Sequence, residues 1–418
     1  MYSSHISRVE ALVGEQEEWR RFCINLIASE QVMSRRARSV LGSDFCHRYA
    51  EGHPGERYYQ GTDKIDTIET DVKRYLKTLF GCMHTEVRPI SGTNANEAVF
   101  SRYIRPGDIV VANSTPAGGH ISHDRAGTVG KYTRNILNFP VTEDGYHIDV
   151  PRSRDLIHTT KPALVIFGKS LFLFPEPIEE LIDVCLEVKA RVVYDGAHVL
   201  GLIAGKQFQD PLAEGAHLIS ASTHKTFPGP QRGLILSNMG FEDWRRIDKG
   251  AFPGSSSNHH LDTLPPLLIT TFEMLAYGQE YAAQVIRNAQ TLAKRLEEKG
   301  MDVQGKEFGY TRSHQVAVDV SRYGGGSAVS SLLKDNNIIL NMNLLPSEPL
   351  SHHDNPSGVR IGVQEMTRFG MMEPEMERIA ALIGECVADA KSVQDEVIKF
   401  RSGFQKVQYS FDDNPPDC

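Results

Sequence analysis

The chain has 418 residues, of which 40% are hydrophobic and 23% charged, as in an ordinary globular protein. Its formal net charge is −8, so it offers no extended basic surface and we expect no nucleic-acid partner. No apolar run approaches the roughly 20 residues of a membrane span, and the polar N-terminus lacks the apolar stretch of a signal peptide, so we expect no membrane partner.

The cysteines indicate a reducing compartment. None of them form a CxxC motif, and none lie at zinc-binding spacing from a histidine. We therefore interpret them as reduced thiols of a cytoplasmic protein, and we expect no metal site. The six are Cys23, Cys46, Cys82, Cys185, Cys386 and Cys418.

The first half of the chain predicts helices around an irregular segment and then a sheet. We expect a helix over residues 1–30, with Val9, Leu12 and Val13 on one face, and another over 63–80. Between them, residues 43–62 break periodicity with Gly, Pro and aromatic residues, as functional segments often do. From residue 107, five β-rich runs alternate with helical stretches: 108–114, 163–168, 191–196, 217–222 and 233–238.

Alternation of strands and helices indicates βαβ units and a mostly parallel sheet, with functional loops at the carboxyl ends of the strands. After an amphipathic helix over 279–299, we expect strands at 315–320 and 337–342 and a last helix over 373–397. We divide the chain into an N-terminal helical arm (1–40), a large α/β domain (41–275), a small C-terminal α+β domain (276–400) and a loosely held polar tail (401–418).

Two of the expected strands are followed by residues that suggest chemistry. Asp195 ends the apolar run RVVYD, where a carboxylate needs a partner, and Lys225 follows the next run. Pyridoxal 5′-phosphate (PLP) requires both groups, because a lysine amine holds its aldehyde as a Schiff base and a carboxylate keeps its pyridine nitrogen protonated. Most lysines are surface charges and most strand-end aspartates are caps, but the two together predict a PLP site.

Two further segments fit the same cofactor. Residues 90–96 place Ser91, Gly92, Thr93 and Asn94 before a helical run, where hydroxyls and backbone N–H groups bind a phosphate. The alternative for this segment is an ordinary helix cap. The glycines of residues 116–123 allow His120 to approach a flat ring, and the alternative is a loop histidine with a local partner.

An ordered set of motifs extends this pattern. It comprises LIASEQ at 26–31, RYAEGHPGERYYQGT at 48–62, SGTNAN at 91–96, DGAHVLGL at 195–202, STHKT at 222–226 and GVRIGVQEMTRFGM at 358–371. Over about residues 20–375 the chain resembles the serine hydroxymethyltransferase family of fold-type I PLP enzymes. The resemblance implies a PLP-dependent transferase fold, with a large domain on a mainly parallel sheet and a small C-terminal α+β domain.

The resemblance also implies roles for individual residues at the cofactor. Lys225 would carry the Schiff base, Asp195 would pair with the pyridinium and His120 would stack on the ring. Further cofactor contacts are implied for Ser91, Gly92, Thr93, Ser170, His198, Thr223, His224 and Tyr49.

On the substrate side, the resemblance implies that Arg360 pairs with the carboxylate of an amino acid, next to Ser29. Glu51 matches the family's acid/base glutamate, and Tyr59 lies beside it in the same motif. In the family these residues reach the site of the neighbouring subunit, so we expect a homodimer with shared active sites.

Several positions depart from the folate-using members of the family. The lysine motif continues Gly229-Pro230-Gln231-Arg232-Gly233 instead of Gly-Pro-Arg-Gly-Gly, and residues 253–266 replace a glycine-rich stretch. Thr115 and Gln31 replace a leucine and an asparagine. These changes, with SHQV at 313–316 and YSFD at 409–412, resemble the L-threonine transaldolases, whereas RYAEGHPGERYY resembles the folate branch.

We therefore expect an aldol-type transferase that makes or breaks the Cα–Cβ bond of a β-hydroxy-α-amino acid through a glycyl carbanion (quinonoid). Our main prediction is a transaldolase-like enzyme with an aldehyde acceptor. The alternative is a serine or α-methylserine hydroxymethyltransferase that uses tetrahydrofolate. Transamination, decarboxylation and a non-catalytic interaction protein with this fold remain further alternatives, and the sequence does not name the acceptor.

Overall fold

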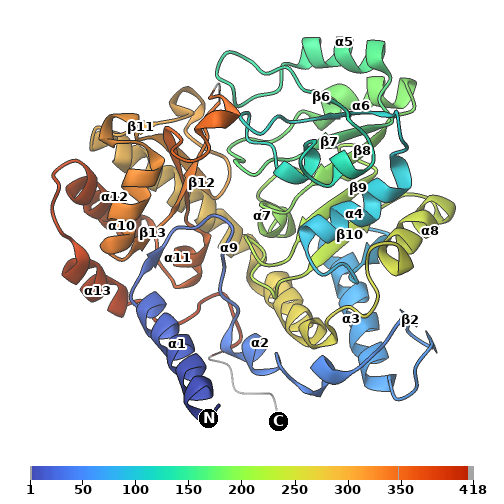
Figure 1. Cartoon of the computed structure of the whole chain (residues 1–418), viewed down its shortest axis with the longest axis horizontal. Helices are drawn as coiled ribbons and strands as arrows, with labels where there is room; N and C mark the ends of the chain where they lie inside the picture. Colours follow the sequence, from blue (N-terminus) through green and yellow to red (C-terminus); the bar gives the residue numbers. More distant parts are fainter. Residues whose placement is uncertain (1, 347, 413–418) are drawn as a thin grey trace.

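The computed structural model describes residues 2–346 and 348–412. Its main element is a seven-stranded sheet, in the order β4–β10–β9–β8–β7–β5–β6, that Figure 1 shows surrounded by helices. The strands from β9 to β6 run parallel, whereas β10 is antiparallel to both of its neighbours. The strands are β4 His84–Glu86, β5 Ile109–Ala112, β6 Asn135–Asn138, β7 Leu164–Phe167, β8 Arg191–Asp195, β9 Leu218–Ser222 and β10 Gly233–Ser237.

The central strands are buried on both faces because alternate side chains point to opposite sides. In β7, Leu164 and Ile166 pack into the hydrophobic cluster that includes α4 Gly92–Tyr103 and α8 Phe241–Lys249. Their neighbours Val165 and Phe167 pack into the larger cluster of the other face. That cluster includes residues of α3 Asp63–Phe80, α5 Val150–Thr160, α6 Ile178–Glu187 and α7 Leu200–Ala204. The expected strands are therefore confirmed as a continuous buried layer.

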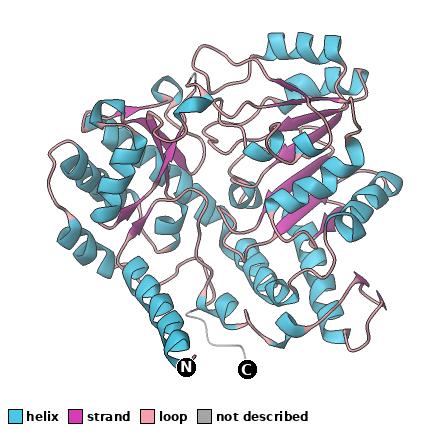
Figure 2. Cartoon of the chain, viewed as in Figure 1, coloured by secondary structure: helices cyan, strands magenta, loops and turns pink. Residues whose placement is uncertain are grey.

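A second, smaller sheet lies beside the first, and Figure 2 shows the two groups of strands with helices around each. It is antiparallel, in the order β11–β12–β15–β14. Its strands are β11 Asp302–Val303, β12 Gln315–Asp319, β14 Asn341–Asn343 and β15 Gly358–Gly362. It packs with α10 Gly326–Asp335, which also contacts α12 Glu373–Val387, and α11 Gln364–Arg368 follows β15 along the chain.

One long helix joins the two parts of the core. α9 Leu264–Glu298 contacts α3 and α7 of the large unit and β11, β12 and α12 of the small one. The expected boundary between residues 275 and 276 falls inside this helix. The division of the chain into separate domains therefore stays a prediction.

The N-terminal segment differs from the expected helix. α1 Ser3–Arg21 ends because β1 Ile24–Asn25 pairs in parallel with β13 Ile338–Ile339. None of the side chains of α1 are buried, and its apolar residues Val9, Leu12 and Val13 are all more than half exposed. After α1 the chain passes through the short α2 Arg35–Ser39, the turn Asp44–His47 and the hairpin of β2 Gly52–His53 and β3 Glu56–Arg57.

The C-terminal third differs in two details. The expected strand at 337–342 is divided between β13 and β14, and the expected last helix is divided between α12 and α13 Gln394–Ser402. The tail is held more firmly than expected, at least as far as residue 412. The Gln408 N–H donates to the Arg368 carbonyl at 2.7 Å, and Asp412 accepts from the backbone N–H groups of Arg35 and Arg36 at the start of α2.

Two further expectations concerned the state of the cysteines and the possibility of a membrane-spanning helix. Cys23, Cys46, Cys82, Cys185 and Cys386 are free thiols, and Cys418 lies outside the described residues. No helix within residues 2–346 and 348–412 is both long and apolar enough to cross a membrane.

The buried layer predicts a contrast within one helix. Leu181 of α6 is fully buried, whereas Leu186 of the same helix is 56% exposed. We expect Leu181→Ala to lower the free energy of unfolding by about 2–5 kcal/mol, because it leaves a cavity under the sheet. Leu186→Ala should change it by no more than about 0.5 kcal/mol. Urea unfolding at one protein concentration measures both, and equal losses would contradict this packing.

Candidate active site

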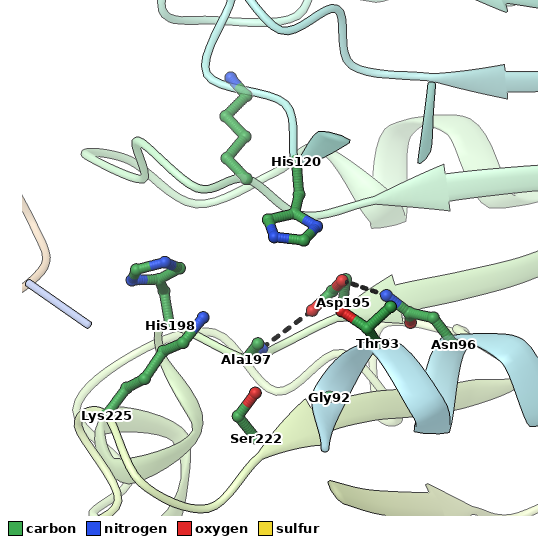
Figure 3. Close-up of a pocket in the computed structure, with 10 residues that line it drawn as sticks. Gly92, Thr93, Asn96, His120, Asp195, Ala197, His198, Ser222 and Lys225 are labelled. Atoms are coloured by element: carbon green, nitrogen blue, oxygen red, sulfur yellow. Dashed lines mark hydrogen bonds between the residues drawn. The ribbon is translucent and has the colours of Figure 1, made fainter. Parts of the chain in front are cut away.

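A cavity lies at the carboxyl ends of β8 and β9, against the first turn of α4 (Figure 3). Open α/β sheets bind their ligands at this edge. The cavity is small, with a volume of about 30 Å³. The lining residues that the sequence predicted are Gly92, Thr93, His120, Asp195, His198 and Lys225. Those it missed are Asn96, Lys169, Ala197 and Ser222.

Asp195 ends β8 and is buried with three donors on its carboxylate, of which the Ala197 N–H donates to Oδ1 at 3.1 Å. Asn96 Nδ2 donates to Oδ2 at 2.8 Å, and His123 Nε2 lies 2.9 Å from the same oxygen. Burial alone raises the pKa of a carboxyl group. Here the contacts with His123, the nearby His120 ring and the hydrogen bond from Asn96 outweigh burial and hold the pKa of Asp195 well below its usual range. The carboxylate is therefore ionised at neutral pH.

Lys225 reaches the cavity from the loop that follows β9. Burial lowers the pKa of its amine to about 8, against the opposing charge of Asp195 and with a smaller contribution from Arg360. Within the described part of the chain, no side chain or carbonyl accepts a hydrogen bond from its Nζ. With a pKa of about 8 the amine is still mostly protonated at pH 7, but its minor uncharged form is far more populated than in an ordinary lysine and can attack an aldehyde.

His120 faces the same space, as Figure 3 shows, together with Asp195, His198 and Lys225. Its Nδ1 accepts from the Ser122 N–H at 3.2 Å and lies 2.7 Å from the Ser122 hydroxyl. Burial lowers the pKa of His120 to about 4, so the ring is neutral. His120 thus has the local partners expected of a loop histidine and also lines the cavity, and its stacking on a cofactor ring stays a prediction.

The first turn of α4 forms the opposite wall. The helix begins at Gly92 and not after the 90–96 segment, and Ser91 caps it by accepting from the Asn94 N–H at 3.1 Å. A Cβ on Gly92 would lie 2.3 Å from the Ser222 hydroxyl, so a side chain at this position would force that hydroxyl to move. The N–H groups of Gly92 and Thr93 belong to the free donors of a helix start, which attract an anion.

His198 is buried and held by a residue that the sequence analysis did not single out. Gln315 Nε2 lies 2.9 Å from His198 Nδ1 and donates to the Ser170 carbonyl at 3.1 Å. Burial holds the pKa of His198 far below its usual value, so the ring is neutral. His314 lies parallel to it with ring centroids 5.8 Å apart. The sequence motif SHQV contains both Gln315 and His314, but nothing in it indicates their contacts with His198.

Arg360 of β15 contacts Ser170, so two residues predicted from the sequence lie together. Its Nη1 donates to the carbonyl and the hydroxyl of Ser170 at 2.8 and 2.9 Å. Its Nε and Nη2 donate to Asn341 Oδ1 at 3.3 and 3.2 Å. Burial lowers the pKa of Arg360 to about 10, which still leaves the guanidinium charged at neutral pH.

Lys169 is the missed lining residue with the strongest partners. Its Nζ donates to the Tyr146 carbonyl at 2.5 Å and lies 3.1 Å from Glu176, whose carboxylate also accepts from Asn113 at 2.6 Å. Its charge is thus balanced by a buried carboxylate. No local sequence signal distinguishes it from a surface lysine, whereas Asn96, Ala197 and Ser222 adjoin predicted residues.

Apart from the acid/base motif, six predicted cofactor or substrate residues are not among those that line the cavity: Ser29, Ser91, Ser170, Thr223, His224 and Arg360. The Thr223 hydroxyl donates to the Pro230 carbonyl at 2.6 Å, within its own loop. Ser29 and His224 line a separate, larger cleft together with Gln31 and Gln231. Their roles at the cofactor or the substrate stay predictions.

The acid/base motif also lies outside the cavity of its own chain. Tyr59 donates to Glu51 Oε2 at 3.4 Å, and the rings of Tyr49 and Tyr59 lie 5.3 Å apart. Tyr49 is 52% exposed and Tyr59 is 42% exposed, and both line a surface pocket beside the hairpin of β2 and β3. The structure assembles these three residues with one another but not with Lys225.

Comparisons with known proteins place this geometry in a family. The family described as serine hydroxymethyltransferase matches residues 4–383. A protein named serine hydroxymethyltransferase from Thermococcus kodakarensis is 48% identical over 422 residues, covering 99% of this chain and 98% of that protein. Its namesake from Methanocella arvoryzae is 47% identical over 407 residues, covering 97% and 96%.

A solved structure of L-threonine transaldolase from Pseudomonas fluorescens superposes with a TM-score of 0.91 at 28% identity, over 99% of this chain and 96% of that one. The expected α/β architecture of fold-type I PLP enzymes, with its small C-terminal unit, is confirmed. The full-length relatives favour the hydroxymethyltransferase alternative over the transaldolase that we expected from single motifs. The chain belongs to the serine hydroxymethyltransferase family and is a PLP-dependent enzyme.

Proposed function

We propose that this protein transfers the hydroxymethyl group of serine to tetrahydrofolate, a reduced pterin, and leaves glycine. The observation that carries the proposal is 48% identity along almost the whole chain to a protein named for this activity. The transaldolase shares only 28% identity, although its fold is the same. The presence of RYAEGHPGERYY, which resembles the folate branch, agrees with this choice.

The residues of the cavity fit PLP. Lys225 offers an unpaired amine for the aldehyde, Asp195 offers an ionised carboxylate for the pyridine nitrogen, and His120 offers a neutral ring beside it. The helix start at Gly92 and Thr93 would hold the phosphate. Bound there, PLP supplies an electron sink for the bond that breaks at Cα.

The substrate side is built around a charged arginine. Arg360 would exchange its contacts with Ser170 and Asn341 for the carboxylate of serine, which a guanidinium binds through two parallel hydrogen bonds. Fixing the carboxylate orients Cα relative to Lys225, and this orientation selects which bond at Cα is broken.

Glu51 would move the proton of the β-hydroxyl group. The Tyr59 hydroxyl donates to its carboxylate at 3.4 Å and orients it. Since the two residues lie on the surface, apart from the cavity of their own chain, we propose that they serve the cavity of a second copy in a homodimer. Removal of the hydroxyl proton allows the hydroxymethyl carbon to leave as formaldehyde for the pterin, with the electron pair remaining on Cα.

Product analysis tests the activity. We expect the holoenzyme to convert ¹³C-labelled serine to glycine and methylene-tetrahydrofolate, with both products identified by mass and with little glycine formed when the pterin is omitted. Lys225→Ala should abolish the reaction, whereas Lys249→Ala, a change at an exposed lysine, should leave it unchanged. Efficient exchange of threonine with an added aldehyde, without tetrahydrofolate, would contradict the proposal in favour of a transaldolase.

The lowered pKa of Lys225 predicts a pH dependence of cofactor uptake. Only the uncharged amine attacks the aldehyde of PLP. The rate constant for reconstitution of the cofactor-free protein should therefore rise with pH, through a midpoint near 8, and level off above it. Stopped-flow absorbance measures this rate. A midpoint near 10.4, the ordinary value for lysine, would show that burial does not lower the pKa of Lys225.

The charged arginine predicts a separate effect on substrate affinity. Arg360→Lys keeps the positive charge but loses the fork of two donors. Losing a charge-assisted hydrogen bond of about 1.5–3 kcal/mol should raise the KM for serine about 10- to 100-fold. Steady-state kinetics measure this change. Arg312→Lys, at an exposed arginine before β12, is the matched control, and a KM that changes equally in both variants would count against a carboxylate contact.

A further inference from the structure

One asparagine fixes the backbone on both sides of Tyr49. Asn258 lies in the segment between α8 and α9, more than 200 positions away in the sequence. Its Nδ2 donates to the Arg48 carbonyl at 2.7 Å, and its Oδ1 accepts from the Ala50 N–H at 3.2 Å. A side-chain amide is suited to this contact because it carries a donor and an acceptor together.

An arginine fixes the backbone on both sides of Glu51. The Arg57 Nη1 donates to the carbonyls of Ala50 and Gly52 at 2.5 and 2.8 Å. Its guanidinium is nearly buried and forms ion pairs with Asp66 at 2.8 Å and with Glu69 at 2.6 Å on α3. The exposed motif is thus attached to α3 through Arg57 and to the 258–263 segment through Asn258.

The 258–263 segment is in turn attached to the loop that carries Lys225. Arg232 follows Lys225 by seven positions and is fully buried. It donates to the His260 carbonyl at 3.0 Å, to the Thr263 hydroxyl and to the Val87 carbonyl, and it contacts His259 Nδ1. His259 is itself fully buried, 3.7 Å from Glu69. Arg232 and the 258–263 segment both lie at positions where the sequence departs from the folate branch.

We propose that Asn258 is a positioning residue for the reaction, acting through the backbone of residues 48–52 to place Tyr49 and Glu51. This inference rests on the proposed function, in which Glu51 moves a proton. Tyr49 and Tyr59 are exposed, and the regular structure that the described part of the motif contains is the two-residue pairing of β2 with β3, so the backbone of residues 48–52 depends on side-chain contacts such as those of Asn258 and Arg57. A displacement of about 1 Å at a reacting group lowers a rate by up to about 100-fold.

The experiment uses the holoenzyme with two readouts. Hydrogen–deuterium exchange reports the mobility of residues 46–60, and steady-state kinetics with serine and tetrahydrofolate report kcat and KM. We expect Asn258→Ala to increase exchange in this segment and to lower kcat about tenfold or more, with the KM for serine and the PLP content unchanged. Asn258→Asp keeps the acceptor for Ala50 but loses the donor to Arg48, so it should lie between wild type and Asn258→Ala.

Ser257→Ala, at the exposed neighbouring position, is the matched control and should alter neither readout. If residues 46–60 exchange as slowly in Asn258→Ala as in the wild type, Asn258 does not hold the segment. If they exchange faster but kcat is unchanged, Asn258 is not a positioning residue. If the wild type does not transfer the hydroxymethyl group at all, the proposed function fails. The kinetic comparison then uses cleavage of threonine to glycine, and the exchange data still decide whether Asn258 holds the segment.

Discussion

A single hydrogen-bond network around the Asp195 carboxylate organises the cavity. Ser220 of β9 donates to Asn96 Oδ1 at 2.6 Å, which turns the amide nitrogen of Asn96 towards Asp195. The same nitrogen donates to the Ser122 hydroxyl at 3.2 Å, and that hydroxyl lies 2.7 Å from His120. The network therefore connects β8, β9, α4 and the loop of His120. A carboxylate buried without these donors would cost several kcal/mol or become protonated, and its partners would lose their orientation with it.

Burial leaves the histidines of the site neutral and Arg360 charged, and this distribution of charge suits an anionic ligand. The rings of His120, His198 and His314 are all neutral because burial lowers their pKa values. The cations Lys225 and Arg360 are also destabilised by burial, but the pKa values of about 8 and 10 leave the guanidinium charged and the amine able to lose its proton. The same desolvation therefore has two results, because arginine and lysine start from different intrinsic pKa values. Arg360 keeps a fixed positive charge that suits a carboxylate, and Lys225 becomes an amine that can lose its proton and react with an aldehyde.

The sequence predicted the site where the signal was local. Strand ends and a motif sufficed for Asp195 and Lys225, because apolar runs predict the strands and parallel strands share one edge. It failed where the partner lies far along the chain. GGHISH contains two histidines, and only the fold reveals that His123 binds the carboxylate while His120 faces the cavity. The helical pattern of residues 1–30 likewise could not show that pairing of β1 with β13 ends α1 at Arg21.

The departures from the folate branch lie outside the cofactor cavity. Arg232 points into the core, where it binds the 259–263 turn, and Gln231 and Gln31 line the larger cleft with Ser29 and His224. None of the ten residues that line the cavity is among the departing positions. Within the described residues, two of these departing positions, Arg232 and Asn258, instead connect the loop of Lys225 to the backbone of the Glu51 motif, because Arg232 binds the 259–263 turn and Asn258 binds the backbone beside Tyr49.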